Sequence, residues 1–88
     1  MFEWDDANVE HIAEHDIYPE EAEDVMTDAR RVNMGAYNTP TEKRRAVVGK
    51  TSGGRYLFVA FTRRQGLFRV VTARDAKESE KRLYRRRA

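Results

Sequence analysis

The chain contains no cysteine, and its first 29 residues contain no lysine or arginine. The lack of cysteine excludes disulfide bonds and thiolate chemistry. Long apolar runs are also missing, because no segment approaches the ~20 apolar residues that a membrane span requires. The acidic N-terminal stretch has no apolar core of the kind found in signal peptides. We therefore expect a cytoplasmic protein that does not associate with membranes.

The length of 88 residues limits the size of the core. A chain this short buries only about 60–65% of its unfolded surface, so its stability is marginal. A hydrophobic content of 40% is enough for one small core, and we expect residues 1–88 to form a single domain. Because 36% of the residues are charged, part of the surface is suited to a partner.

Charge is divided sharply along the chain. Residues 1–29 carry 11 acidic side chains, whereas residues 30–88 carry all 17 lysines and arginines against four acids. The formal charges of the two parts are therefore −11 and +13, although the whole chain carries only +2. A strongly basic part is typical of proteins that bind nucleic acid. The alternative is that the acidic part only neutralises the basic part within the fold.

The acidic part predicts two helices. Asp5 or Asp6 suits the start of a first helix over residues 6–15, because a carboxylate accepts hydrogen bonds from the free N–H groups there. Pro19 suits the first turn of a second helix. The apolar residues of this second helix recur at helical spacing, at Ala22, Val25, Met26 and Ala29.

The basic part predicts four strands and a final helix. Residues 51–54 indicate a hairpin turn, because their two glycines tolerate the positive φ of tight turns. Strand 55–62 is apolar on both faces, which favours a central position in the sheet. Sequential strands joined by short turns indicate an antiparallel sheet with the helices packed on it, an α+β fold. The expected strands are residues 31–37, 44–50, 55–62 and 67–75, and the expected helix is 76–87.

Arginines gather near the ends of the last two strands. Arg63 and Arg64 end one strand, and Arg69 and Arg74 lie on the next. A guanidinium suits phosphate because it stays charged and donates two hydrogen bonds at once. These arginines are candidates for holding an RNA backbone, and the alternative is a solvated edge with arginine–carboxylate pairs. Strict alternation along the last strand places Arg69 and Arg74 on opposite faces.

Glu80 lies on the packing stripe of the final helix, together with Tyr84. A buried carboxylate is costly without a partner, and Arg74 just before the helix is the expected one. The pair either fixes the helix on the sheet or holds Arg74 so that it stabilises a phosphate transition state. The two roles are compatible. We expect Tyr84 to pack in the core with its hydroxyl at an edge.

His11 and His15 are four residues apart on the first predicted helix. This spacing can bind zinc, but no further ligands are evident and the order differs from the zinc-protease motif. We therefore expect no metal and no cofactor. A histidine beside an apolar arc usually packs through a hydrogen bond, but its pKa also suits acid–base catalysis. His15 is the stronger candidate for that role.

Other basic side chains are expected to attract phosphate without reading sequence. Part of the C-terminal charge cluster also complements the negative end of its helix. The positions expected to contact RNA are Arg55, Arg69, Lys81 and Arg85.

An ordered set of motifs resembles the BrnT toxins of bacterial type II toxin–antitoxin systems. One departure is Asp16, where the resemblance implies a glycine that ends the first helix. The motifs cover nearly the whole chain, and they are Trp4-Asp5, Asn8, His11-Ile12, His15, and residues 19–23, 49–51, 54–59, 61–62, 72–75, 80–82 and 84.

This resemblance implies a small RelE-like ribonuclease fold and a cognate antitoxin, usually a ribbon–helix–helix protein that binds operator DNA with the toxin attached. It implies RNA cleavage without a metal, in which a ribose 2′-hydroxyl attacks the adjacent phosphate. The strongest catalytic matches are Arg74 and Glu80, followed by Arg63 or Arg64. His15 or Tyr84 is expected to assist proton transfer.

We therefore predict a ribonuclease toxin that inhibits translation and growth until its antitoxin neutralises it. RNA and antitoxin are expected to compete for one basic face. The alternative is a non-catalytic module that binds nucleic acid or protein and acts with a DNA-binding partner.

Overall fold

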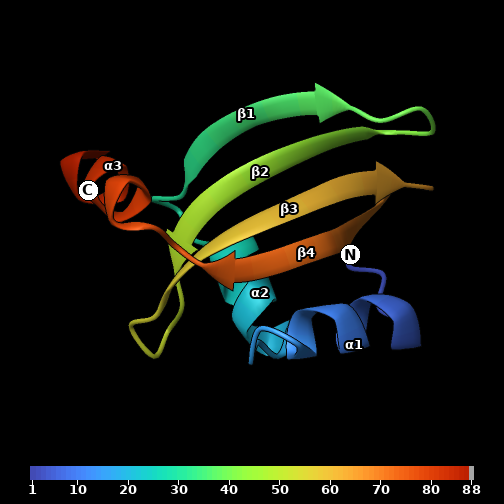
Figure 1. Cartoon of the computed structure of the whole chain (residues 1–88), viewed down its shortest axis with the longest axis horizontal. Helices are drawn as coiled ribbons and strands as arrows, with labels where there is room; N and C mark the ends of the chain where they lie inside the picture. Colours follow the sequence, from blue (N-terminus) through green and yellow to red (C-terminus); the bar gives the residue numbers. More distant parts are fainter. Residues whose placement is uncertain (88) are drawn as a thin grey trace.

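The computed structural model describes residues 1–87 and has the predicted order of elements. The strands form one antiparallel sheet in the order β1-β2-β3-β4, so β2 and β3 are central (Figure 1). The predicted α+β arrangement is therefore confirmed. Its elements are α1 (Asp6–Ala13), α2 (Pro19–Met26), β1 (Val32–Asn38), β2 (Lys43–Lys50), β3 (Tyr56–Arg64), β4 (Leu67–Asp75) and α3 (Glu78–Arg87).

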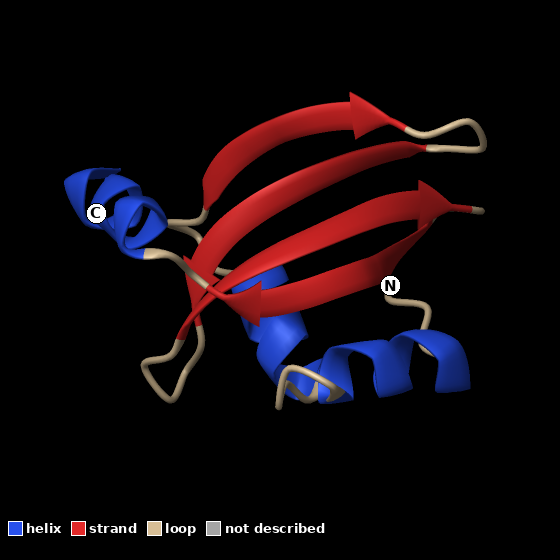
Figure 2. Cartoon of the chain, viewed as in Figure 1, coloured by secondary structure: helices blue, strands red, loops and turns tan. Residues whose placement is uncertain are grey.

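The helices cover opposite faces of the sheet. Val47 of β2 belongs to a buried cluster with Val25 of α2, and the next residue, Val48, belongs to a second cluster with Tyr84 of α3. Successive strand residues point to opposite faces, so α2 and α3 lie on different sides. We call these sides the α1–α2 face and the α3 face. Figure 2 shows α1 and α2 beneath the sheet and α3 at one end of it. Within residues 1–87, no helix is both long and apolar enough to cross a membrane.

Helix α1 begins with the predicted cap. The Asp5 carboxylate accepts from the Asn8 N–H at 3.1 Å, and the Asn8 amide oxygen accepts from the Asp5 N–H at 2.8 Å. The helix ends at Ala13, two residues earlier than predicted. Asp16 then adopts a left-handed φ of +59°, and the Ile17 N–H donates back to the carbonyl of Ile12. Asp16 thus occupies the helix-ending position where a glycine is implied.

The other helices also differ slightly from the predicted bounds. Helix α2 starts at Pro19 as expected but ends at Met26, so Ala29 lies beyond the helix and is exposed. Helix α3 starts at Glu78, two residues later than predicted. The reason is that the Ala76 N–H donates to the Tyr56 carbonyl, which holds Ala76 against β3 and outside the helix.

The N-terminal residues lie beside β4. Phe2 forms a parallel bridge with Phe68, and the Glu3 N–H donates to the Phe68 carbonyl at 2.8 Å. The buried Asn8 amide donates to the carbonyls of Glu3 and Val70, at 3.0 and 3.1 Å. These contacts join the N-terminal segment, α1 and β4. They place the first acidic side chains of the chain, Glu3 and Asp5, against Arg69 of β4.

A bulge in β4 changes which arginines share a face. Thr72 pairs with Ala60, but Val70 pairs with Phe61, so Val71 is an extra residue in the ladder. Arg74 pairs with Phe58 and Arg69 pairs with Thr62, and these two β3 residues point to the same side. Arg69 and Arg74 therefore both lie on the α3 face. The prediction that they occupy opposite faces is wrong, because it assumed unbroken alternation.

Candidate functional site

Arg74 is the best-held arginine on the α3 face. Its Nη1 donates to Glu80 Oε1 at 2.9 Å and its Nη2 donates to Glu80 Oε2 at 3.0 Å. Its guanidinium also lies 4.0 Å above the centroid of the Phe58 ring. A two-pronged pair and a stacked ring fix both the position and the plane of the group. The predicted Arg74–Glu80 contact is thus present in the fold.

The Arg74 guanidinium keeps hydrogen-bonding capacity after these contacts. A second Nη1 hydrogen bond goes to the Asp75 carbonyl, at 3.1 Å. Within residues 1–87, this leaves the Nε–H and one Nη2–H without a protein acceptor. The side chain is 32% exposed, so part of it is accessible from solvent.

Glu80 is buried but stays ionised. The hydrogen bonds from Arg74 hold the pKa of the Glu80 carboxyl below its usual value, against the effect of burial, and the Lys77 N–H adds a bond at 2.7 Å. A carboxyl with a lowered pKa carries no proton near neutral pH and is unsuited to act as a general acid. Its chemistry is that of a group that orients Arg74.

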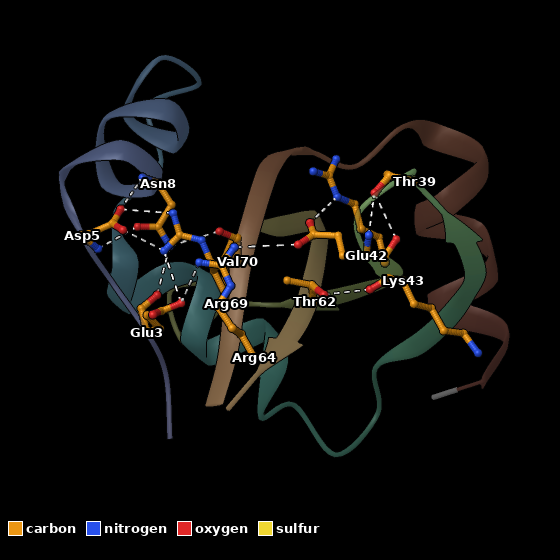
Figure 3. A network of polar contacts seen from close by, with 11 residues as sticks. Glu3, Asp5, Asn8, Thr39, Glu42, Lys43, Thr62, Arg64, Arg69 and Val70 are labelled. Atoms are coloured by element: carbon orange, nitrogen blue, oxygen red, sulfur yellow. Dashed lines mark hydrogen bonds and ion pairs between the residues drawn. The ribbon is translucent and has the colours of Figure 1, made fainter. Parts of the chain in front are cut away.

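The other arginines of this face form a chain of ion pairs at the far end of the sheet (Figure 3). Arg69 lies between Asp5 and Glu3, at 2.9 and 3.4 Å, and its side chain is only 14% exposed. The Arg69 guanidinium lowers the pKa of Asp5. Arg64 lies 3.8 Å from both Glu3 and Glu42 and is half exposed. Arg69 is therefore largely committed to carboxylates, whereas Arg64 is loosely held.

The structure separates Arg63 from Arg64. Arg64 follows Thr62 by two residues and shares the α3 face with it. Arg63 points to the α1–α2 face, where its guanidinium lies 5.4 Å from the Phe68 ring centroid. Of these two predicted residues, only Arg64 is on the same face as Arg74.

The two histidines are exposed and differ in their contacts. His11 Nε2 lies 3.2 Å from the hydroxyl of Thr72, a β4 residue two positions before Arg74 and on the same face. The His15 side chain makes no hydrogen bond to residues 1–87, although its ring packs edge-on against that of His11. The sequence favours His15 over His11 for acid–base catalysis. One feature of the sequence does point to His11: it follows Asn8 by one helical turn and so lies on the same side of α1. Asn8 is buried and donates a hydrogen bond to β4.

Tyr84 is held by a hydrogen bond to the segment that follows α2. Its hydroxyl donates to Asp28 Oδ2 at 2.7 Å, and burial together with this bond raises the pKa of Tyr84 to about 12. Asp28 also accepts from the backbone N–H groups of Arg30 and Lys50. This arrangement joins α3 to the loop after α2 and favours a structural role for the tyrosine.

The remaining predicted RNA contacts fall into two groups. Arg55 is held by Asp75 at 2.9 Å and by Glu21 at 3.3 Å, and the bond to Asp75 raises its pKa. Lys81 and Arg85 of α3 instead gather over the Tyr56 ring, at 6.0 and 5.5 Å from its centroid. Arg85 also lies 3.7 Å from Glu78, so of the four predicted RNA contacts only Lys81 has no carboxylate within 4.0 Å among residues 1–87.

Within residues 1–87, no three or more His, Cys, Asp or Glu side chains are grouped as ligands of a metal ion.

Comparison with known proteins identifies one family. The model of the family described as "Ribonuclease toxin, BrnT, of type II toxin-antitoxin system" matches residues 4–80. That span begins just before α1 and reaches Glu80 in α3. No curated protein matches the chain.

Proposed function

The chain belongs to the BrnT family of ribonuclease toxins of type II toxin–antitoxin systems, and on this basis we propose that it cleaves RNA without a metal ion and so inhibits translation and growth. The cleavage uses the ribose 2′-hydroxyl as nucleophile. An O2′–P bond forms, the P–O5′ bond breaks, and a 2′,3′-cyclic phosphate and a 5′-hydroxyl result. One proton leaves O2′ and one is delivered to O5′.

The Arg74–Glu80 pair is the observation that supports this proposal best. The free Nε–H and Nη2–H of Arg74 donate to the non-bridging phosphate oxygens, where negative charge grows in the transition state. Glu80 and the Phe58 ring hold the guanidinium in place, so little reorganisation is needed during reaction. Arg64, on the same face, attracts the neighbouring backbone.

Proton transfer is assigned to His11 of α1 and to His15 just beyond its end. His11 reaches the strand of Arg74 through Thr72, and His15 stays a candidate because it is exposed beside His11. Tyr84 is less suited, since a hydroxyl with a pKa of about 12 that already donates to Asp28 holds its proton at neutral pH.

Membership of a type II system implies a cognate antitoxin. We propose that this antitoxin is a ribbon–helix–helix protein that neutralises the toxin, and that operator DNA is bound only through it. Inhibition of translation sets the site of action in the cytoplasm.

The decisive experiment measures cleavage of single-stranded RNA by the antitoxin-free protein, with and without a chelator. Wild-type protein should cleave equally in both. Arg74→Lys keeps the charge but loses the planar fork, and should slow cleavage by about 10²-fold or more. Lysine is preferred to alanine here because it leaves Glu80 a charged partner. Arg82→Lys, on the exposed side of α3, is the matched control, and wild-type rates for Arg74→Lys would refute the assignment.

One observation favours a second candidate, a binding module without catalysis. Arg64 and Arg69 already pair with carboxylates of the same chain, which leaves fewer cations free for a transition state. This alternative predicts that folded, antitoxin-free protein binds RNA but yields no cyclic phosphate product.

A further inference from the structure

The α1–α2 face carries a groove that the ribonuclease site does not use. Its volume is about 840 Å³, and it lies where the sheet extends past the end of α2. Its apolar lining is formed by Met1, Phe2, Met26, Val47, Phe61 and Phe68. The Phe61 and Phe68 rings pack edge-to-face, with centroids 5.7 Å apart. The lining thus offers aliphatic groups and ring edges, which suit apolar side chains better than stacked bases.

The same groove is surrounded by positive charge. Four cations line it: Arg31, Lys43, Arg45 and Arg63. Among residues 1–87, none of the four has a carboxylate within 4.0 Å. The arginines of the α3 face, in contrast, are ion-paired. Within residues 1–87, four cations of the strands have no carboxylate within 4.0 Å, and three of them, Lys43, Arg45 and Arg63, line this apolar groove on the side opposite Arg74. The fourth, Lys50, lies over the Tyr56 ring on the α3 face.

We propose that this groove binds an acidic, amphipathic segment of the cognate antitoxin. Apolar side chains of the segment fill the lining, and its carboxylates pair with the four cations. An apolar centre with a charged rim is the general composition of protein–protein interfaces. The inference rests on the proposed neutralisation by an antitoxin and adds the surface on which it acts.

This location differs from the sequence expectation that RNA and antitoxin compete for one basic face. Glu42 lines the groove, and it also holds Arg44 and Arg64 on the α3 face, at 2.8 and 3.8 Å. A segment in the groove therefore contacts the loop before β2 that anchors one end of the ion-pair chain. The two faces meet there, although their principal binding groups are separate.

The test uses charge reversal at two exposed cations of the groove. The variant Lys43→Glu/Arg45→Glu is compared with Arg82→Glu/Arg86→Glu, which makes the same change in net charge on exposed positions of α3. The cognate antitoxin is titrated into each purified protein by calorimetry. The groove variant should bind at least tenfold more weakly than wild type, and the control within twofold. Thermal melting establishes that both variants are folded, and Lys43→Gln/Arg45→Gln replaces the reversal if that variant melts early.

Three results would overturn the inference. Equal losses in both variants mean that only net charge matters. Unchanged antitoxin affinity in the groove variant means that the segment binds elsewhere. The groove binds RNA instead if the groove variant loses tenfold in affinity for single-stranded RNA with a 2′-deoxy cleavage site while its affinity for the antitoxin is unchanged. Failure of the ribonuclease proposal is seen separately, as absence of RNA cleavage by wild-type protein that still binds the antitoxin.

Discussion

At the scale of single residues, Glu80 links the candidate site to stability. Its carboxylate is buried, ionised and bonded to Arg74 and to the start of α3. Sequence reasoning identified the pair, because a carboxylate on a packing stripe needs a partner. It did not identify the Phe58 ring beneath Arg74, since that contact depends on the pairing of β3 with β4.

The Glu80 pair should make stability depend on pH. The pKa of Glu80 is lowered in the fold, so the unfolded chain binds more protons than the folded one as pH falls. The contribution is complete above the unfolded value of about 4.3 and is lost as pH drops through the folded pKa. Glu80→Gln should cost about 1–3 kcal/mol at pH 7. In urea titrations, the loss of unfolding free energy in Glu80→Gln relative to wild type should become smaller below pH 4. A loss that does not depend on pH would contradict this prediction.

Asp16 offers a second test at this scale. A non-glycine residue at its left-handed φ of +59° carries a steric cost of about 1 kcal/mol. Asp16→Gly should therefore raise the free energy of unfolding, by up to about 1 kcal/mol. Glu14→Gly is the control, because Glu14 has a right-handed φ of −61°. Glycine there only increases the conformational entropy of the unfolded chain and should lower stability. If both variants are equally destabilised, the strain at Asp16 is absent.

At the scale of elements, the arrangement of the sheet and its helices depends on features that the alternation of strand residues does not predict. The bulge at Val71 brings Arg69 and Arg74 to one face. Gly49 of β2 lets α2 approach, since an added Cβ would lie 3.0 Å from Val25 Cγ1 and 3.2 Å from the Val25 carbonyl oxygen. The position of α2 thus depends on a residue with no side chain.

The α2–β2 contact can be tested by adding one methyl group. Gly49→Ala should destabilise the protein by about 1–3 kcal/mol, because the backbone of α2 must move. Gly53→Ala, in the hairpin turn, meets only Thr51 Oγ1 at 3.8 Å and should change stability much less. Chemical denaturation of both variants compares them directly. Similar midpoints for the two would show that α2 does not pack as tightly as described.

At the scale of the whole molecule, the charge division has two consequences. Within the described residues 1–87, four ion pairs join the acidic N-terminal part to the basic remainder: Glu21–Arg55, Glu3–Arg64, Glu3–Arg69 and Asp5–Arg69. Part of the basic charge is therefore neutralised within the fold, as the alternative interpretation held. Among the cations of residues 1–87 that have no carboxylate within 4.0 Å, Lys50 and Lys81 lie over the Tyr56 ring, and four others line the groove of the opposite face.

Binding of RNA should accordingly depend on salt. For single strands, the affinity falls with a slope of about 0.7 per phosphate contact in a log–log plot. Three contacts on the α3 face would therefore weaken binding about 20-fold between 50 and 200 mM salt. Fluorescence anisotropy with RNA carrying a 2′-deoxy cleavage site measures this without turnover. An affinity that does not change with salt would exclude the arginines as the main RNA contacts.

The sequence by itself determined the local features: the order of the elements, the Asp5 cap, the turn at residues 51–54 and the pairing of Arg74 with Glu80. These depend on neighbouring residues and on periodicity, which a single chain displays. Only the tertiary structure decided which arginines share a face, which are neutralised, which histidine reaches β4 and where a groove opens. Those outcomes depend on one extra residue in a strand and on contacts between residues far apart in the chain, such as Asp5 with Arg69, and no local pattern encodes them.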